Sequence, residues 1–205
     1  SDFINIYSIY EALEQVIISS GGTIEFSNNG KFINDPDVVI GIFGEEPYAE
    51  MLGDLKDVSF VETDPKFLPL LEAINAQNIP TVSIFLSGRP LEVNRQLNAS
   101  DAFIAAWLPG SAVEGIADVI FIKDNKINYD FTGKLSYSWP RTKDQAVLNF
   151  TDSIYDPLFP FGYGLTYTSD LEVERIQTNR SDSKLDLLNV FLGAASIPGK
   201  EFVVT

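Results

Sequence analysis

Three short hydrophobic runs constrain the fold of this chain most strongly, and the first of them is rich in β-branched residues. They read "DVVIGIF" at 37–43, "IPTVSIFL" at 79–86 and "AFIAAWL" at 102–108. Apolar runs without regular polar alternation are typical of strands buried on both faces, and such strands occur in parallel sheets covered by helices. The sequence therefore predicts an α/β fold with a mostly parallel sheet and helices on both faces.

Helical segments separate these runs. The segment "SIYEALEQVIISSGG" predicts a helix over Ile9–Ser19, which begins with a capping box of Ser8 and Glu11 and ends before two glycines. Further helices are expected through "KFLPLLEAINAQN", "PLEVNRQLNASD" and "SAVEGIADVIF", with short strands at "TIEF" and "VSFVE". Alternation of strands with helices supports the parallel arrangement.

The amino-acid composition of the chain changes after Lys123. Gly, Pro and aromatic residues dominate up to about residue 168, and the last segments, such as "LEVERIQ" and "KEFVV", alternate like β-strands. We expect an α/β sandwich domain over residues 1–168, followed by the start of a truncated β-rich module over residues 169–205. The opening lacks Met, and the end stops within a strand-like run, so we expect both to be boundaries of a piece of a longer protein.

Charge and composition exclude several functions. The formal charge is −15, from 29 acidic and 14 basic residues, which argues against nucleic acid or an anionic membrane as a partner. The chain contains no His and no Cys, so Ser-His-Asp and Cys-His catalysis and His or Cys zinc sites are excluded. No metal or other cofactor is expected, and carboxylates are the natural candidates for any catalysis.

The loop "GEEPYAEMLGD", residues 44–54, directly follows the first buried run. Ligands of parallel α/β sheets bind at the carboxyl ends of the strands, so this loop lies where a site is expected. Its four carboxylates belong to Glu45, Glu46, Glu50 and Asp54. Acidic loops are more often solvated surface than sites, and the residues alone do not separate the four.

Two other residues follow buried runs at the same predicted edge. Arg89 is interpreted as a clamp on loop carbonyls or on a carboxylate, with direct ligand contact as the alternative. Trp107 is interpreted first as the filling of a core edge, with stacking on a sugar ring as the alternative.

Five blocks, taken together and in order, resemble one family. They are "GEEPYAEMLGD", "SGRPLEV", "AFIAAWLPGSAVEGIADVIF", "GKLSYSWPR" and "YDPLFPFGYGLTY". Together they are similar to the C-terminal α/β sandwich domain of family 3 glycoside hydrolases, in the branch of exo-β-1,3/1,4-glucanases and β-glucosidases. The resemblance covers about residues 8–167.

The resemblance implies a retaining glycosidase acting on a β-glucan or a β-glucoside, secreted or periplasmic, without a cofactor. The catalytic Asp nucleophile is then expected in an N-terminal barrel domain, which would be the partner of this domain. Glu50, which follows Tyr48-Ala49, matches the general acid/base of the exo-glucanase branch. Tyr48 and Trp107 are then candidates for substrate contact.

The remaining polar residues near the loop receive supporting roles on this resemblance. Glu46, Asp54 and Arg89 are expected near the site as structural residues. Glu45 is also expected to shape the loop, through hydrogen bonds to its backbone or to neighbouring cations.

The chain also departs from the family pattern. The opening strand of type V-L-V-V-G and the following Gly-Gly-Trp loop do not precede Ser1. We therefore expect half an active site, no activity from the chain alone, and a gap or unpaired edge in the sheet that another chain fills. Two alternatives stay open: a non-catalytic carbohydrate-binding version of the same domain, and an unrelated α/β domain that binds a ligand or a partner.

Overall fold

The computed structural model describes residues 6–48, 50–123, 126–169, 173–174, 176, 187–188 and 201–204, with backbone alone for residues 50, 123, 173–174, 187–188 and 201–204. The elements, in chain order, are α1 (Ile9–Ser19), β1 (Thr23–Phe26), β2 (Val38–Gly44), the 3-10 helix η1 (Glu50–Gly53), α2 (Phe67–Asn75), β3 (Thr81–Leu86), α3 (Asn94–Asn98), β4 (Ala102–Trp107), α4 (Glu114–Ile120), β5 (Ile122–Lys123), β6 (Lys126–Ile127), β7 (Val173–Glu174), β8 (Leu187–Leu188) and β9 (Glu201–Val204).

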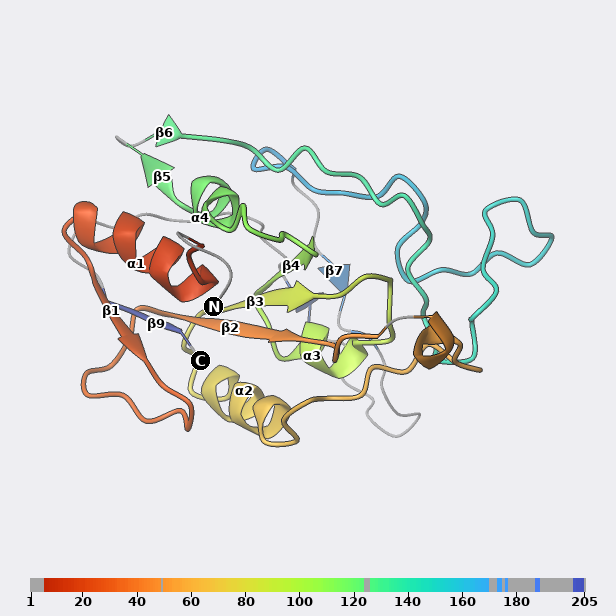
Figure 1. Cartoon of the computed structure of the whole chain (residues 1–205), viewed down its shortest axis with the longest axis horizontal. Helices are drawn as coiled ribbons and strands as arrows, with labels where there is room; N and C mark the ends of the chain where they lie inside the picture. The colour runs from red at the N-terminus through yellow and green to blue at the C-terminus, as the bar shows by residue number, and fades with distance from the viewer. Residues whose placement is uncertain are drawn as a thin grey trace.

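The main sheet has five strands in the order β1-β9-β2-β3-β4, and all its pairs are parallel. Within it, Phe43 of β2 lies opposite Phe85 of β3. Parallel pairing brings the carboxyl ends of β2, β3 and β4 to one edge of the sheet (Figure 1). The predicted parallel sheet is confirmed.

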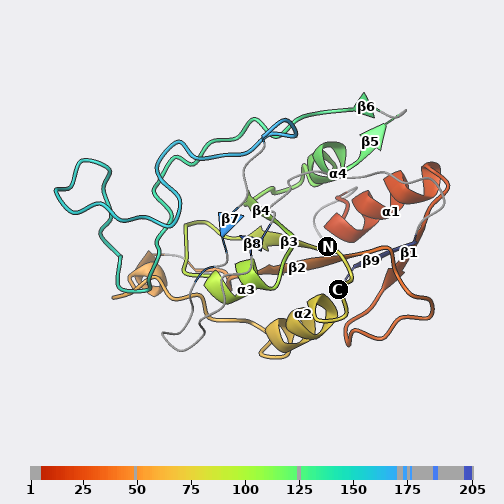
Figure 2. The same cartoon turned by 180° about the vertical axis from the view of Figure 1, so that it is seen from behind.

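Helices cover both faces of this sheet, as Figures 1 and 2 show, with α1 and α4 on one side and α2 and α3 on the other. Neighbouring side chains of a strand point to opposite faces. Ile84 accordingly packs in the cluster of α1 and α4, whereas Phe85 packs toward α3, and both are at most 1% exposed. This two-sided burial explains why the strand sequences are apolar throughout.

The first helix begins where the capping box predicts. The Ser8 hydroxyl accepts a hydrogen bond from the Glu11 backbone N–H at 3.2 Å, and the Glu11 carboxylate accepts one from the Ser8 N–H at 2.7 Å. After the helix, Gly21 has a φ of +80°, a conformation that glycine adopts without strain. The predicted bounds Ile9–Ser19 are confirmed.

The position between β1 and β2 is occupied by β9, which comes from the end of this same chain. Thr23 of β1 pairs with Glu201, and Val38 of β2 pairs with Phe202. The sheet therefore has no gap at this position, in contrast to the expectation that a strand from another chain is needed there. The other late strands, β7 and β8, pair antiparallel. The division into units at residue 168 remains a prediction.

The segment "VSFVE" does not form the expected strand. Its only ladder contact in the described part of the chain is one bridge between Ser59 and Glu92. Phe60 instead packs its ring against Phe43 and Phe85, with ring centroids 5.6 and 5.3 Å away. The apolar residues of this segment therefore belong to a loop that packs over the core, and the segment is not part of a sheet.

Candidate functional site

The loop after β2 lies beside the loop after β3 at the carboxyl edge of the sheet. The backbone N–H of Glu45 donates to the carbonyl of Leu86 at 3.1 Å. The N–H of Ser87 donates in turn to the carbonyl of Trp107, at the end of β4, at 3.2 Å. The three candidate segments of the sequence therefore meet, as their positions after buried strands predicted.

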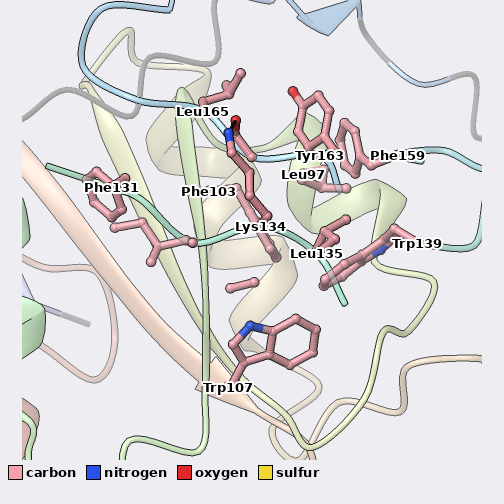
Figure 3. A pocket seen from close by; sticks show the side chains of 14 residues that line it. Leu97, Phe103, Trp107, Phe131, Lys134, Leu135, Trp139, Phe159, Tyr163 and Leu165 are labelled. Atoms are coloured by element: carbon pink, nitrogen blue, oxygen red, sulfur yellow. Dashed lines mark hydrogen bonds between the residues drawn. The ribbon is translucent and has the colours of Figure 1, made fainter. Parts of the chain in front are cut away.

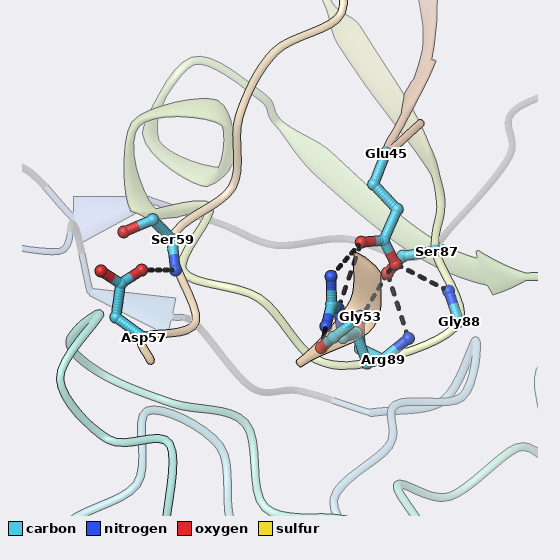
Figure 4. Close-up of polar contacts among 7 residues, drawn as sticks. All are labelled: Glu45, Gly53, Asp57, Ser59, Ser87, Gly88 and Arg89. Atoms are coloured by element: carbon cyan, nitrogen blue, oxygen red, sulfur yellow. Dashed lines mark hydrogen bonds and ion pairs between the residues drawn. The ribbon is translucent and has the colours of Figure 1, made fainter. Parts of the chain in front are cut away.

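Glu45 and Arg89 form an ion pair at this junction, with Arg89 Nη2 and Glu45 Oε2 3.1 Å apart (Figure 4). The other carboxylate oxygen, Oε1, accepts hydrogen bonds from the Ser87 hydroxyl at 2.7 Å and the Gly88 N–H at 3.1 Å. The side chains of Glu45 and Arg89 are only 11% and 24% exposed. Both oxygens of Glu45 are thus occupied by protein groups, which gives this carboxylate a structural role.

The guanidinium of Arg89 also contacts the loop on either side of Glu50. Its Nη1 donates to the carbonyl of Gly53 at 2.7 Å, and its carbon lies 4.1 Å from the centroid of the Tyr48 ring. One face of Tyr48 is therefore covered by a cation. Arg89 clamps a carbonyl and a carboxylate, as the first interpretation of this residue held.

The other carboxylates of the loop are placed differently. Glu46 and Asp54 are exposed, and neither makes a side-chain hydrogen bond or ion pair with another described residue. Glu50 begins η1, at the centre of the loop, and its side chain lies outside the described part of the structure. The roles assigned to these residues remain predictions.

A fifth carboxylate, Asp57, lies just beyond this loop, and sequence reasoning did not single it out. It accepts a hydrogen bond from the Ser59 N–H at 3.0 Å (Figure 4). Hydrogen bonds from the Ser59 side chain and backbone, with a smaller contribution from the charge of Lys143, hold the pKa of Asp57 below its usual value. An ionised Asp57 therefore orders this turn and is unsuited to donate a proton.

Trp107 lies at the wall of a cavity of about 190 Å³ on the β4 side of the sheet (Figure 3). Its φ is +54°, uncommon for a residue with a bulky side chain, at the point where the pairing of β3 and β4 shifts register. Its ring lies 6.0 Å from that of Trp139, which is buried. Trp107 packs at the edge of this aromatic cluster, and its contact with substrate remains a prediction.

Most of the cavity wall comes from the segments after Lys123, and the remainder comes from α3 and β4. Phe159 and Tyr163 stack there with centroids 4.7 Å apart, and burial raises the pKa of Tyr163. The indole Nε1 of Trp139 is buried without a hydrogen-bond partner among the described residues. These aromatic residues pack against one another and line the cavity.

Several apolar side chains on the segments that follow β2, β4 and Trp139 are exposed. We call them the edge face; its members are Met51, Leu52, Leu55, Leu108, Val147, Phe150, Ile154 and Phe161. The loop that follows Trp139 projects beyond the carboxyl edge at the same end as η1 (Figures 1 and 2). Phe150 and Phe161 stack on each other with centroids 5.1 Å apart while remaining exposed. Exposed apolar side chains on segments that lie at the same end of a molecule make that end a candidate for an interaction site.

Comparison with known proteins agrees with this geometry. The sequence profile described as "Glycosyl hydrolase family 3 C-terminal domain" matches residues 3–167. The chain belongs to glycoside hydrolase family 3. Among curated relatives, it is 28% identical to a periplasmic beta-glucosidase of Salmonella typhimurium over 155 residues, and 33% identical to a lysosomal beta glucosidase of Dictyostelium discoideum over 139 residues.

A solved structure supports the same assignment. The exo-1,3/1,4-beta-glucanase of a Pseudoalteromonas species superimposes with a TM-score of 0.83 and 49% identity over 89% of this family 3 chain. The chain spans only 23% of that glucanase, and 19% and 16% of the two curated relatives. Each of these matches therefore concerns one domain of a larger enzyme.

Two further observations concern the described residues of this family 3 domain. None of its described helices is both long and apolar enough to cross a membrane. The described Asp and Glu side chains include no group of three or more arranged to hold a metal ion.

Proposed function

We propose that this domain supplies the general acid/base residue, Glu50, to a retaining exo-acting β-glucosidase or β-glucanase. The observation that carries the proposal is the 49% identity to the exo-1,3/1,4-beta-glucanase over 89% of the chain. The position of the 44–54 loop at the carboxyl edge of a parallel sheet supports it independently, because ligands bind at that edge.

The chemistry requires two carboxyl groups about 5–5.5 Å apart. One attacks the anomeric carbon and displaces the leaving oxygen, to which the other donates its proton; the second group then takes a proton from the water that releases the sugar. In our proposal the acid is Glu50 and the nucleophile is an Asp of an N-terminal domain. Glu45 is unsuited to be the acid, because both of its oxygens are engaged by Arg89, Ser87 and Gly88.

The partner of this domain is, in our proposal, the N-terminal domain of the same enzyme, docked on the edge face. Met51 and Leu52 of that face directly follow Glu50 and are 82% and 76% exposed. Covering them would bring the nucleophile of the other domain close to Glu50 and exclude water from both. The isolated chain is then inactive, because it lacks the nucleophile.

The substrate, in our proposal, is a β-glucan or a β-glucoside, and the enzyme acts outside the cytoplasm. Polymeric glucans are met there, and one curated relative is named periplasmic. Neither a metal nor an organic cofactor takes part in the proposed reaction, because two carboxyl groups suffice for it.

The test is the variant Glu50→Gln in the full-length protein that carries this domain. Its kcat/KM on phenyl β-glucoside, whose leaving group needs protonation, should fall by about 10²–10⁴-fold. On 2,4-dinitrophenyl β-glucoside, whose leaving group departs unaided, kcat/KM should change little. Glu46→Gln serves as the matched control, because it removes a neighbouring carboxylate of the same loop. Undiminished kcat/KM of Glu50→Gln on the phenyl glucoside would refute the proposal and favour a non-catalytic domain.

A further inference from the structure

We infer that Arg89 is a positioning residue for the backbone segment that carries Glu50; the inference rests on the proposed function of Glu50. The guanidinium group of Arg89 contacts the loop at points before and after that residue. It reaches Tyr48, two positions before Glu50, and Gly53, three positions after it. A single rigid group therefore ties both ends of the short segment that contains the proposed acid.

The contacts use most of the guanidinium. Nε and Nη2 donate to Glu45 Oε2 at 3.2 and 3.1 Å, Nη1 donates to the Gly53 carbonyl at 2.7 Å, and the guanidinium carbon lies over the Tyr48 ring, 4.1 Å from its centroid. Only arginine offers a planar fork of donors together with a face that stacks on an aromatic ring. A lysine ammonium can keep the charge here but cannot make all these contacts at once.

The group that holds the loop is itself fixed to the sheet. The Arg89 N–H donates to the Ser87 hydroxyl oxygen at 3.1 Å. Glu45 receives hydrogen bonds from Ser87 and from the Gly88 N–H, so its carboxylate is held by the loop after β3 (Figure 4). β2 and β3 pair from Val39 and Thr81 up to Gly44 and Leu86, so this anchor lies directly at the end of a continuous ladder. Arg89 and Glu45 thus fix the position of η1 relative to the sheet.

Tyr48 fits tightly between two glycines of the same site. A Cβ atom at Gly53 would lie 2.7 Å from the Tyr48 ring, and one at Gly88 would lie 2.6 Å from its hydroxyl. Real Cβ atoms do not approach this closely, so larger residues would push the ring from its place. The loop is therefore held by a close fit at the edge and hydroxyl of the Tyr48 ring and by Arg89 over its face.

This arrangement matters because proton donation depends steeply on position. A general acid acts at hydrogen-bond distance from the leaving oxygen, and a displacement of about 1 Å can cost about 10²-fold in rate. Loosening the clamp should therefore slow the steps in which Glu50 transfers a proton. It should spare a bond cleavage that needs no proton.

The test compares Arg89→Lys with wild type in the full-length protein, using kcat/KM, which reports on cleavage of the glycosidic bond. On phenyl β-glucoside we expect a loss of about tenfold to 10²-fold, and on 2,4-dinitrophenyl β-glucoside a change below about threefold. Guanidinium ion added to Arg89→Ala should restore part of the loss on the phenyl substrate. Active sites are counted by the burst from 2,4-dinitrophenyl 2-deoxy-2-fluoro-β-glucoside, so that unfolded enzyme does not enter the rates.

Control variants separate the possible outcomes. Arg95→Met removes an exposed ion pair with Glu72 and should leave both rates unchanged. Glu45→Gln weakens the clamp without deleting a large side chain. We expect it to lower kcat/KM on the phenyl substrate less than the Arg89 variants do, and it takes their place in the test if they fold poorly. Equal losses on both substrates would overturn the positioning role.

The parallel measurement on Glu50→Gln distinguishes failure of this inference from failure of the proposed function. If Glu50→Gln discriminates between the two substrates and Arg89→Lys does not, Glu50 is the acid and Arg89 does not position it. If Glu50→Gln does not discriminate either, the proposed function fails and the inference about Arg89 fails with it.

Discussion

Glu45 and Arg89 pair across the carboxyl ends of β2 and β3, with 3.1 Å between Oε2 and Nη2. Because both side chains are largely buried, breaking the pair by Arg89→Met leaves a carboxylate without its cation. We expect the free energy of unfolding to fall by about 1–3 kcal/mol, less than for a fully buried pair because water partly screens it. Urea denaturation followed by circular dichroism measures this change.

The exposed pair of Arg95 and Glu72 provides the reference for that measurement. Its side chains are 59% and 45% exposed, so Arg95→Met should cost less than about 1 kcal/mol. Equal losses in the two variants would mean that the clamp contributes nothing beyond an ordinary surface pair.

The second prediction concerns the stability contributed by Phe85. It is 1% exposed and packs against the rings of Phe43, Phe60, Phe103 and Trp139. Phe85→Ala should lower the free energy of unfolding by about 3–5 kcal/mol, because it removes buried area and leaves a cavity. Ile33→Ala, at an exposed position, should change it by no more than about 0.5 kcal/mol. A small loss in Phe85→Ala would mean that this aromatic cluster can collapse around the missing ring.

The capping box of α1 gives a pH-dependent prediction. Hydrogen bonds from the Ser8 N–H and then from its hydroxyl hold the pKa of Glu11 below its usual value of 4.5 in the folded chain. The ionised carboxylate therefore stabilises the fold above that pH, and this stabilisation is lost as the pH falls through the lower, folded pKa. The Tm difference between wild type and Glu11→Gln should be positive near neutral pH and shrink in acid. A difference that stays constant would rule out the linkage.

The edge face yields the next prediction. Phe150→Asp should weaken the association of this chain with a separately expressed N-terminal domain by about tenfold or more, because it places a charge on an apolar docking surface. The Tm of the chain alone should fall only slightly, since Phe150 is exposed and loses only its stacking on Phe161. Titration calorimetry of the two domains gives the affinity.

Ile33→Asp is the matched control for the edge face. Ile33 is also exposed, and the loop between β1 and β2 to which it belongs lies away from η1 (Figure 1). It should leave the affinity unchanged. If Phe150→Asp and Ile33→Asp change the affinity for the N-terminal domain equally, docking does not depend on the edge face.

Much of the fold could be predicted because local signals and burial agree. Ile84 and Phe85 belong to a run without polar alternation, and both faces of that run are buried. The start of α1 was predictable because its cap is made by residues three positions apart, Ser8 and Glu11. The prediction of a strand around Phe60 was wrong because a loop that packs over a core carries the same apolar residues as a strand.

The meeting of the candidate segments at one edge was predictable, whereas the contacts among their side chains were not. Position after a buried strand was enough to bring the 44–54 loop and Arg89 to one edge. The pairing of Arg89 with Glu45, out of the four carboxylates of the loop, could not be predicted from the sequence. It depends on the register of β2 and β3 and on the hydrogen bonds that Ser87 and Gly88 donate to Glu45. The place of β9 between β1 and β2 was likewise hidden, since strand order is a long-range property.

The most direct test of the account is the product that Glu50→Gln forms in azide. The proposed acid also activates water in the second step, so the variant should accumulate a glycosyl-enzyme from 2,4-dinitrophenyl β-glucoside. Azide attacks the anomeric carbon without needing a base, and the bond to the Asp nucleophile then breaks. The account predicts a higher kcat with azide and β-glucosyl azide as the product. Unchanged kcat, with glucose as the sole product, would contradict it.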